Sequence, residues 1–230
     1  MNDGASAIIQ RPLENPATTR QDRPAMDPAH DESQLERLTF FSDAVFAIAM
    51  TLLVIEVRLP AIDSFSDRGL GRGLLELYPH YIGFVSSFLV IGRFWISHHQ
   101  LFGLLDGTSD RLLWANLFFL FAIAFMPFPT AILSVYVQLR VGVGFYTFWL
   151  TLVGVLNVFL IRAALADRSL VKPGIAIDVE RRRRRGGWVP VLLGALAFAA
   201  GMISPVWALV ALAFGGPLIG YLLRRERKAG

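Results

Sequence analysis

Long hydrophobic segments separated by short polar segments dominate this sequence. The first apolar run, residues 40–59, has about 20 residues, which as a helix would cover roughly 30 Å, the thickness of the hydrocarbon core of a bilayer. The last apolar region, residues 188–223, is too long for one such span, and Ser204 and Pro205 divide it into two. The pattern predicts an all-α polytopic membrane protein with six transmembrane helices. The predicted spans are residues 38–59, 74–98, 112–135, 142–165, 188–204 and 205–223.

Polar segments frame these spans. Residues 1–34 hold several prolines among mixed charges and lack apolar periodicity, which predicts a disordered tail. Residues 35–224 then form one transmembrane domain, followed by a short tail at 225–230. Pro127 and Pro129 lie inside the third span and predict a kink, because each removes a helical hydrogen bond. The composition agrees, since 54% of the 230 residues are hydrophobic and 17% are charged, more apolar than one soluble core requires.

The distribution of basic residues predicts the orientation in the membrane. Six spans place both termini on one side, and most Lys and Arg residues fall on that side. The rule that cytoplasmic loops are positively charged therefore predicts a multi-pass protein of the cell inner (plasma) membrane with both termini in the cytoplasm. The opposite side would hold Arg58, Arg68, Arg72 and Arg140, and Arg93 would lie inside a span.

Five consecutive arginines lie in residues 166–187, a stretch predicted to be a charged connection between the fourth and fifth spans. We interpret them first as a determinant of topology, and anionic lipid, such as phosphoinositide or cardiolipin, is the alternative partner. Basic residues in short runs of a membrane protein do not indicate nucleic-acid binding. The five residues are Arg181, Arg182, Arg183, Arg184 and Arg185.

The first span contains polar side chains where an ordinary membrane anchor has none. Arg37, Ser42 and Asp43 lie at its start, Thr51 in its middle and Glu56 near its end. Ionisable groups at membrane depth are costly and normally face the interior of a bundle or a water-filled path. This helix is therefore predicted to line a functional surface.

Arg37 and Asp43 are six residues apart, which is about 240° around a helix, so they cannot readily pair with each other. We expect them to find partners on other helices, in a network that supports the first helix and does not coordinate ions. A simpler interpretation is that the tryptophan and histidines anchor the protein at the membrane interface. The candidate partners at the same depth are Trp95, His98, His99 and Asn116.

Several kinds of chemistry find no support in the sequence. Cysteine is absent, which excludes disulfides, thiolate metal sites and cysteine nucleophiles. His98 and His99 are adjacent, so on a helix they would point about 100° apart and could not bind the same metal ion. No Walker A sequence, dinucleotide-binding turn or catalytic set is present. We therefore expect no enzymatic activity, no cofactor and no resident metal.

The start of the first span carries a motif, RxxxFSD, formed by Arg37, Phe41, Ser42 and Asp43 and followed by AVFAI. This motif resembles the signature of the transmembrane protein 175 family of potassium channels, found as single-repeat bacterial proteins and a double-repeat endolysosomal protein in animals. The span count, Trp95 and the histidine pair also agree, so the resemblance covers residues 35–223. It implies a homotetramer whose first helices line a central pore that potassium ions cross transiently. The family lacks a glycine-rich carbonyl filter, and this sequence has no TVGYG-like loop.

The resemblance also implies roles for individual residues. Ile48 would form the narrowest ring, Thr51 a hydroxyl layer and Ile55 a further apolar ring. The spacing is compatible, because Ile48, Thr51, Leu52 and Ile55 share one stripe of a helix. Apolar rings of this kind gate by dewetting. Glu56 would then lie near the outer mouth and concentrate cations.

Other interpretations of the same residues stay open. A stripe of this kind, taken without the motif, more often packs against a neighbouring helix. Asp43, the two histidines and Glu56 could instead form the relay of a proton-coupled transporter or a proton leak. A non-conducting membrane scaffold is the third possibility.

Overall fold

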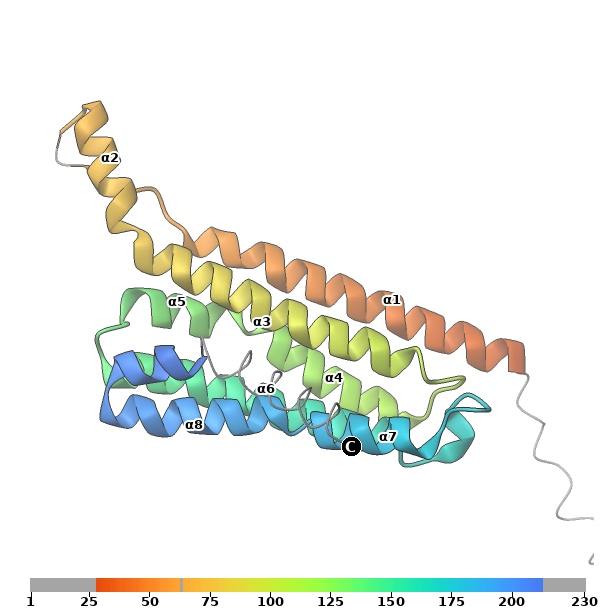
Figure 1. Ribbon diagram of the computed structural model, residues 1–230. Coiled ribbons are helices and arrows are strands. Elements are labelled where there is room, and N and C mark those ends of the chain that lie inside the picture. The colour runs from red at the N-terminus through yellow and green to blue at the C-terminus, as the bar shows by residue number, and fades with distance from the viewer. Residues whose placement is uncertain (1–27, 63, 213–230) are drawn as a thin grey trace, which may run out of the picture.

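The structure is a computed structural model and describes residues 28–62 and 64–212. This part of the chain is all-α, as predicted, and forms an elongated bundle (Figure 1). Its β-structure is limited to an isolated bridge between Leu105 and Val171. The helices are α1 (Pro28–Leu52), η2 (Leu53–Glu56), α2 (Asp67–Glu76), α3 (Tyr78–Phe102), α4 (Asp110–Ala124), α5 (Pro127–Val135), α6 (Arg140–Ala164), η3 (Arg168–Leu170), α7 (Ile177–Gly186) and α8 (Val189–Ile203).

Four helical segments in the described residues are long and apolar enough to cross a membrane, and the bent pair α2 and α3 makes a fifth if it is counted as one span. The chain is therefore a multi-pass membrane protein. The sixth predicted span, 205–223, starts with helical residues 205–212 and otherwise lies outside the described residues. The four segments are Ser33–Glu56, Asp110–Val135, Arg140–Ala164 and Ile177–Ile203.

Prolines mark the breaks in these spans. The helix of the third span is interrupted at Phe125 and Met126, directly before Pro127, where the sequence predicts a kink. Pro79 lies in the first turn of α3, where its missing N–H costs no hydrogen bond. The chain bends by 46° between α2 and α3, just ahead of this proline.

Three predicted boundaries are wrong. The tail was predicted to be disordered to residue 34, but α1 begins at Pro28, because proline is well suited to the first position of a helix. The second span was predicted to start at residue 74, but α3 starts at Tyr78. The link before it contains a separate helix, α2, which is capped by Ser66 through the backbone N–H of Gly69 at 3.1 Å.

The third correction concerns the arginine run. It was predicted to lie in a connection, but it belongs to helix α7, which leads into α8 through Gly187 and Trp188. Asp178 and Glu180 occupy the first turn of α7, and arginines occupy its last turn. This arrangement of charges favours a helix, because acidic groups stabilise the N-terminal end of the helix dipole and basic groups its C-terminal end.

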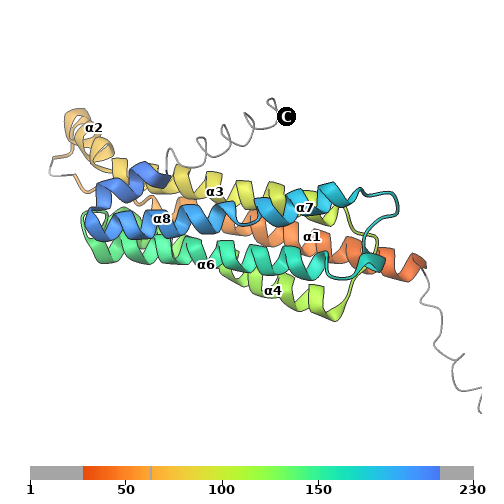
Figure 2. The same cartoon turned by 60° about the horizontal axis from the view of Figure 1, so that its bottom comes forward.

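Helix α6 lies at the centre of the bundle and packs against α4, α5 and α8. Figure 2 shows α8 running alongside α6 for most of its length. Glycines allow this close approach: a Cβ atom added at Gly154 would lie 2.9 Å from the backbone nitrogen of Val191, and one added at Gly194 would lie 3.0 Å from the Cα of Thr151. Helix α1 lies at the edge of the bundle, against α3 and α4 (Figure 1).

Candidate functional site

The two faces of α1 differ in burial. The face toward α3 and α4 is almost completely buried at Ser42, Phe46 and Ala49. The opposite face is apolar and exposed, with 58% of Ile48 and 66% of Ile55 accessible. Burial of an apolar face normally stabilises a helix, so a face that remains open within one chain must contact lipid or another molecule.

The exposed face of α1 contains the residues to which the resemblance assigned the pore. Ile48, Thr51, Leu52 and Ile55 are all exposed, and we call them the α1 stripe. The Thr51 hydroxyl donates a hydrogen bond to the carbonyl oxygen of Ile48 at 2.9 Å. The chain changes to a 3₁₀-helix at Leu53, in which residues about three apart lie above one another, so Ile55 follows Leu52 along the helix.

Glu56 lies at the end of the 3₁₀-helix and is half-buried. It is the last residue of this element, directly before the chain leaves the helix at Val57. The carboxylate therefore lies at one end of the α1 stripe.

A chain of buried side-chain hydrogen bonds joins α1 to α4 and α3. The Ser42 hydroxyl donates to the carbonyl oxygen of Leu38 at 2.7 Å and accepts from the Asn116 amide nitrogen at 2.9 Å. The Asn116 amide oxygen lies 2.9 Å from His98 Nε2. Because a carbonyl oxygen can only accept, His98 carries a proton on Nε2.

Aromatic rings enclose the His98 imidazole. It stacks on Phe102 with the ring centroids 4.0 Å apart, lies parallel to Phe119 at 6.2 Å, and meets Phe46 of α1 edge-on at 5.5 Å. His98 Nδ1 is buried and has no hydrogen-bond partner among the described residues. The imidazole therefore fixes the relative positions of α1, α3 and α4 through both a hydrogen bond and ring contacts.

A second connection between α1 and α3 uses the adjacent motif residue. The Trp95 indole N–H donates to Asp43 Oδ1 at 2.8 Å, and the Trp95 ring contacts His99 at 5.9 Å between centroids. Neighbouring motif residues thus bind different helices, Ser42 to α4 and Asp43 to α3. We call Ser42, Asp43, Trp95, His98 and Asn116 the motif network.

Two residues of the motif lie outside this network. Arg37 is exposed and forms no ion pair within the described part of the chain. Phe41 is also exposed, at 52%. The structure therefore brings the serine and aspartate of RxxxFSD together with the expected partners, and leaves the arginine and phenylalanine on the surface of the single chain.

A second polar cluster was not predicted from the sequence. The Thr130 hydroxyl donates to Ser87 Oγ at 2.8 Å, and Ser87 Oγ lies 3.1 Å from the Tyr146 hydroxyl. These three buried residues join α3, α5 and α6 directly beside the proline break. Hydroxyl residues within apolar spans were the available signal, but their spacing does not show that they meet.

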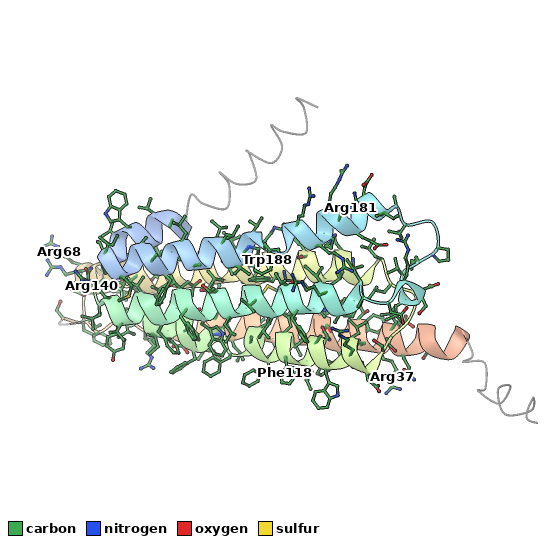
Figure 3. All side chains as sticks on the ribbon, turned by 90° about the horizontal axis from the view of Figure 1, so that it is seen from below. Arg37, Arg68, Phe118, Arg140, Arg181 and Trp188 are labelled. Atoms are coloured by element: carbon green, nitrogen blue, oxygen red, sulfur yellow. The ribbon has the colours of Figure 1, made fainter. Side chains whose placement is uncertain are left out.

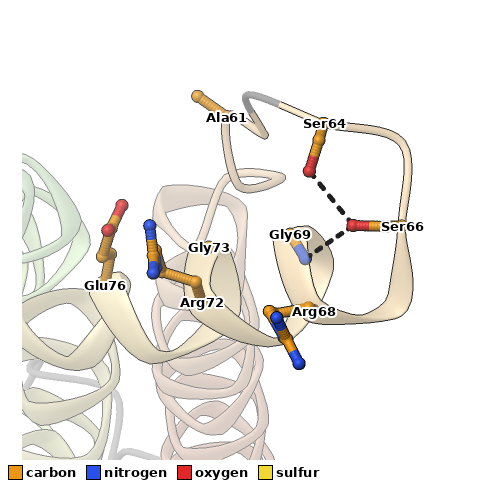
Figure 4. A pocket seen from close by; sticks show the side chains of 8 residues that line it. All are labelled: Ala61, Ser64, Ser66, Arg68, Gly69, Arg72, Gly73 and Glu76. Atoms are coloured by element: carbon orange, nitrogen blue, oxygen red, sulfur yellow. Dashed lines mark hydrogen bonds between the residues drawn. The ribbon is translucent and has the colours of Figure 1, made fainter.

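The end of the bundle that carries α2 has a small surface hollow, shown in Figure 4. Ser66 lies in it, held by the cap of α2 and by a hydrogen bond of 3.0 Å with Ser64. Arg68 and Arg72 line the same hollow. These contacts are those of a helix cap, and they involve neither the α1 stripe nor the motif network.

The basic residues divide between the two ends of the bundle. Figure 3 shows Arg37 and Arg181 toward one end, and Arg68 and Arg140 at the other. The groups that the sequence assigned to opposite sides of the membrane are therefore separated along the bundle axis. Among the described residues, no three His, Asp or Glu side chains are close enough together to hold a metal ion.

These features define a class of protein: a multi-pass helical membrane protein in which a polar network holds an edge helix whose outer face is apolar. The chain matches the model of the TMEM175 family, described as endosomal/lysosomal potassium channel TMEM175, over residues 37–127. A protein of Chamaesiphon minutus named as a potassium channel is 36% identical over 193 residues, covering 82% of this chain and 94% of that protein. The chain belongs to the TMEM175 family, which confirms the resemblance of the motif.

Other relatives carry related names. A potassium channel of Streptomyces collinus is 41% identical over 102 residues, 44% of this chain and 48% of that protein. The human protein named endosomal/lysosomal proton channel TMEM175 is 25% identical over 173 residues, 74% of this chain and 34% of that protein.

Solved structures share the fold. The crystal structure of a lysosomal potassium-selective channel TMEM175 homolog from Chamaesiphon minutus superposes with a TM-score of 0.72 and 31% identity, covering 84% of this chain and 98% of that one. A variant of the potassium channel MtTMEM175, crystallised with a nanobody–MBP fusion, gives a TM-score of 0.58 at 16% identity and supports the fold alone.

Proposed function

We propose that this chain is the subunit of a potassium-permeable cation channel that conducts ions passively. The observation that carries the proposal is the α1 stripe, an apolar and exposed surface on the helix that carries the family motif. The relatives with the largest shared coverage are named as potassium channels, and no enzymatic role is proposed.

The conducting path would lie between copies of this chain, most simply in a homotetramer. One α1 helix cannot enclose an aqueous path, but four copies around an axis would stack Ile48, Leu52 and Ile55 into apolar rings. Such constrictions control conduction by excluding water. Thr51 would add a ring of hydroxyl groups, although its hydroxyl also bonds the Ile48 carbonyl. A ring of Glu56 carboxylates would concentrate cations at the outer mouth.

The motif network would have a structural role in this channel. Its hydrogen bonds lie on the face of α1 opposite to the α1 stripe, so it would set the position and rotation of the pore helix without touching the ions. Arg37 and Phe41 are exposed in the single chain, and contacts with a neighbouring subunit would give them partners.

Proton transport is the second candidate function, because several animal relatives are named proton channels. Asp43 and His98 are the titratable members of the motif network. They are held by Trp95 and Asn116 respectively and are not bonded to each other. A proton relay would need further steps between them, so the passive potassium channel is the better-supported function.

In the membrane, both termini and the α7 arginines would face the cytoplasm. The separation of basic residues along the bundle supports this orientation (Figure 3). The same arginines would lie at the headgroup level of the inner leaflet, where contact with anionic lipid is favourable.

The purified chain in potassium-loaded liposomes would test the function. Potassium efflux with the pH equal on both sides of the membrane would support a passive channel, with empty liposomes as the control. Efflux that strictly requires a proton gradient would favour the transporter. Absence of flux from a correctly assembled protein would contradict both and leave a membrane scaffold.

A further inference from the structure

A side-chain hydrogen bond ties α7 to α3, and each of these helices carries an arginine near this contact. Arg93 lies on α3, nine residues before the end of that helix, so about 14 Å inside its terminus. Arg183 lies on α7, and its guanidinium donates a hydrogen bond to Gln100 Oε1 of α3 at 3.1 Å. Arg93 and Gln100 are seven residues apart, close to two helical turns, and so share a face of α3.

Both guanidinium groups are positively charged, and neither forms an ion pair among the described side chains. The electrostatic interaction between Arg93 and Arg183 is that of like charges. Among the side chains that the structure describes, those of residues 33–62 and 64–212, the ion pair formed is Arg168 with Glu180, at 3.2 Å. Two like charges at this depth are costly without a counter-charge, because ionisable groups within membrane spans normally have partners.

The surroundings of the pair combine basic groups with apolar surface. Arg93 is exposed and Arg183 is half-buried, so both remain accessible to a ligand. Trp188 follows the arginine run, and Figure 3 shows it on the line that continues from α7 into α8. From Trp188 an exposed apolar stripe continues along α8 through Leu192 and Leu196, which are 61% and 59% accessible. The arginine run is therefore followed, farther along the same helical segment, by exposed apolar side chains.

We propose that Arg93 and Arg183 form a binding site for the phosphate group of an anionic phospholipid. Guanidinium groups match the geometry of phosphate oxygens and bind them through charge-assisted hydrogen bonds. A phosphodiester between the two arginines would remove their repulsion, and its acyl chains would run along the exposed surface of the spans. The depth of Arg93 within α3 favours a lipid over free phosphate. The arginines that face away from α3 contribute only a general attraction to the surface.

Native mass spectrometry of the full chain, titrated with phosphatidylglycerol and with phosphatidylcholine, tests this site. We expect the unmodified protein to retain phosphatidylglycerol preferentially. Replacing both arginines, Arg93→Gln with Arg183→Gln, should reduce that preference about thirtyfold, as expected for two basic groups near a bound anion. Arg93→Lys with Arg183→Lys keeps the charge but not the paired donors, and should reduce it by less.

The matched control is Arg181→Gln with Arg182→Gln, which removes the same total charge, two arginines, but takes both from α7 and leaves α3 unchanged. It should leave most of the preference intact, and an equal loss in this control would overturn the site in favour of diffuse attraction. Inorganic phosphate in large excess should not displace the lipid, and displacement would overturn the assignment to a lipid. Size-exclusion profiles and potassium flux in phosphatidylcholine vesicles should match the parent in every variant. The binding readout does not depend on conduction, so it stays valid even if the proposed channel function fails.

Discussion

Helices α1 and α6 are both long and apolar, but the chain covers them to very different extents. Helix α6 is surrounded by α4, α5 and α8, and its buried residues occur along its whole length. Helix α1 is buried along one face and leaves Ile48 and Ile55 exposed on the other. Packing within one subunit therefore accounts for the apolar residues of α6. It does not account for the outward face of α1, which needs surroundings that a single chain does not supply.

The largest effect is expected where α6 meets α8. Gly154→Leu would place side-chain atoms where the backbone of Val191 already lies, since even a Cβ atom would be 2.9 Å from its nitrogen. Overpacking against backbone that cannot move costs roughly 1–3 kcal/mol or more, so folded protein should be largely lost. Fluorescence-detected size-exclusion chromatography would measure the loss.

Gly92→Ala on α3 is the matched control, because a Cβ atom there would meet nothing within 4 Å. It should be neutral or stabilise the helix by up to about 1 kcal/mol. If both glycines tolerate substitution equally, α6 is not packed as tightly as this comparison requires.

The second prediction concerns the buried face of α1. Asn116→Leu removes the partner of both Ser42 and His98: it leaves His98 Nε2 buried without a hydrogen bond, and Ser42 Oγ keeps only its bond to the Leu38 carbonyl oxygen. A buried polar group without a partner costs about 1–3 kcal/mol, so thermal stability and the yield of folded protein should fall together. His99→Ala, on the exposed side of Trp95, should change stability little. A stable Asn116→Leu variant with normal flux would show that the motif network does not hold α1 in place.

Much of this arrangement follows from the sequence, and the parts that do not have identifiable causes. The fourth span was predicted as residues 142–165 and is observed as Arg140–Ala164, because a continuous apolar run has clear ends. Depth along the spans indicated Trp95, His98, His99 and Asn116 as candidate partners, since polar groups at equal depth in a bundle must satisfy one another. Helix α7 was missed because five like charges suggest a solvated connection, whereas acidic residues in its first turn offset them.

The polar contacts between helices were harder to predict. Ser87, Thr130 and Tyr146 lie on three different helices, and their meeting depends on how α3, α5 and α6 rotate. The pairing of Ser42 with α4 and of Asp43 with α3 also depends on rotation, because adjacent residues point about 100° apart. Periodicity gives the faces of a helix, but not which neighbour each face contacts.

The third prediction tests the exposed face of α1 by function. Ile48→Asn should leave folding nearly unchanged, because Ile48 is 58% exposed within the chain. It should raise potassium conductance and weaken discrimination among cations, since a polar ring stays wet. Lowering the barrier by about 1.4 kcal/mol would increase flux about tenfold.

Leu117→Asn on α4 provides the control for this substitution, since Leu117 is an exposed apolar residue, at 47%, on a different helix. Its liposome flux should match that of the parent. Parent-like flux in Ile48→Asn, or an equal rise in Leu117→Asn, would mean that the exposed face of α1 contacts lipid and does not form the constriction.

The smallest effect is expected at the end of the α1 stripe. Glu56→Gln removes a carboxylate that would attract cations to the outer mouth, but leaves the apolar rings in place. Single-channel current should fall by about twofold at roughly 0.01 M salt, where the Debye length is about 30 Å, and should match the parent near 1 M salt, where it is about 3 Å.

Glu76→Gln on α2, which removes the same charge from an exposed site on another helix, should have less effect at either concentration. Dependence on salt separates an electrostatic role from a structural one, because a distorted pore would conduct poorly at every ionic strength. A current that falls equally at both salt concentrations would show that Glu56 has a structural role. The conducting surface of α1 would then consist of the α1 stripe without Glu56.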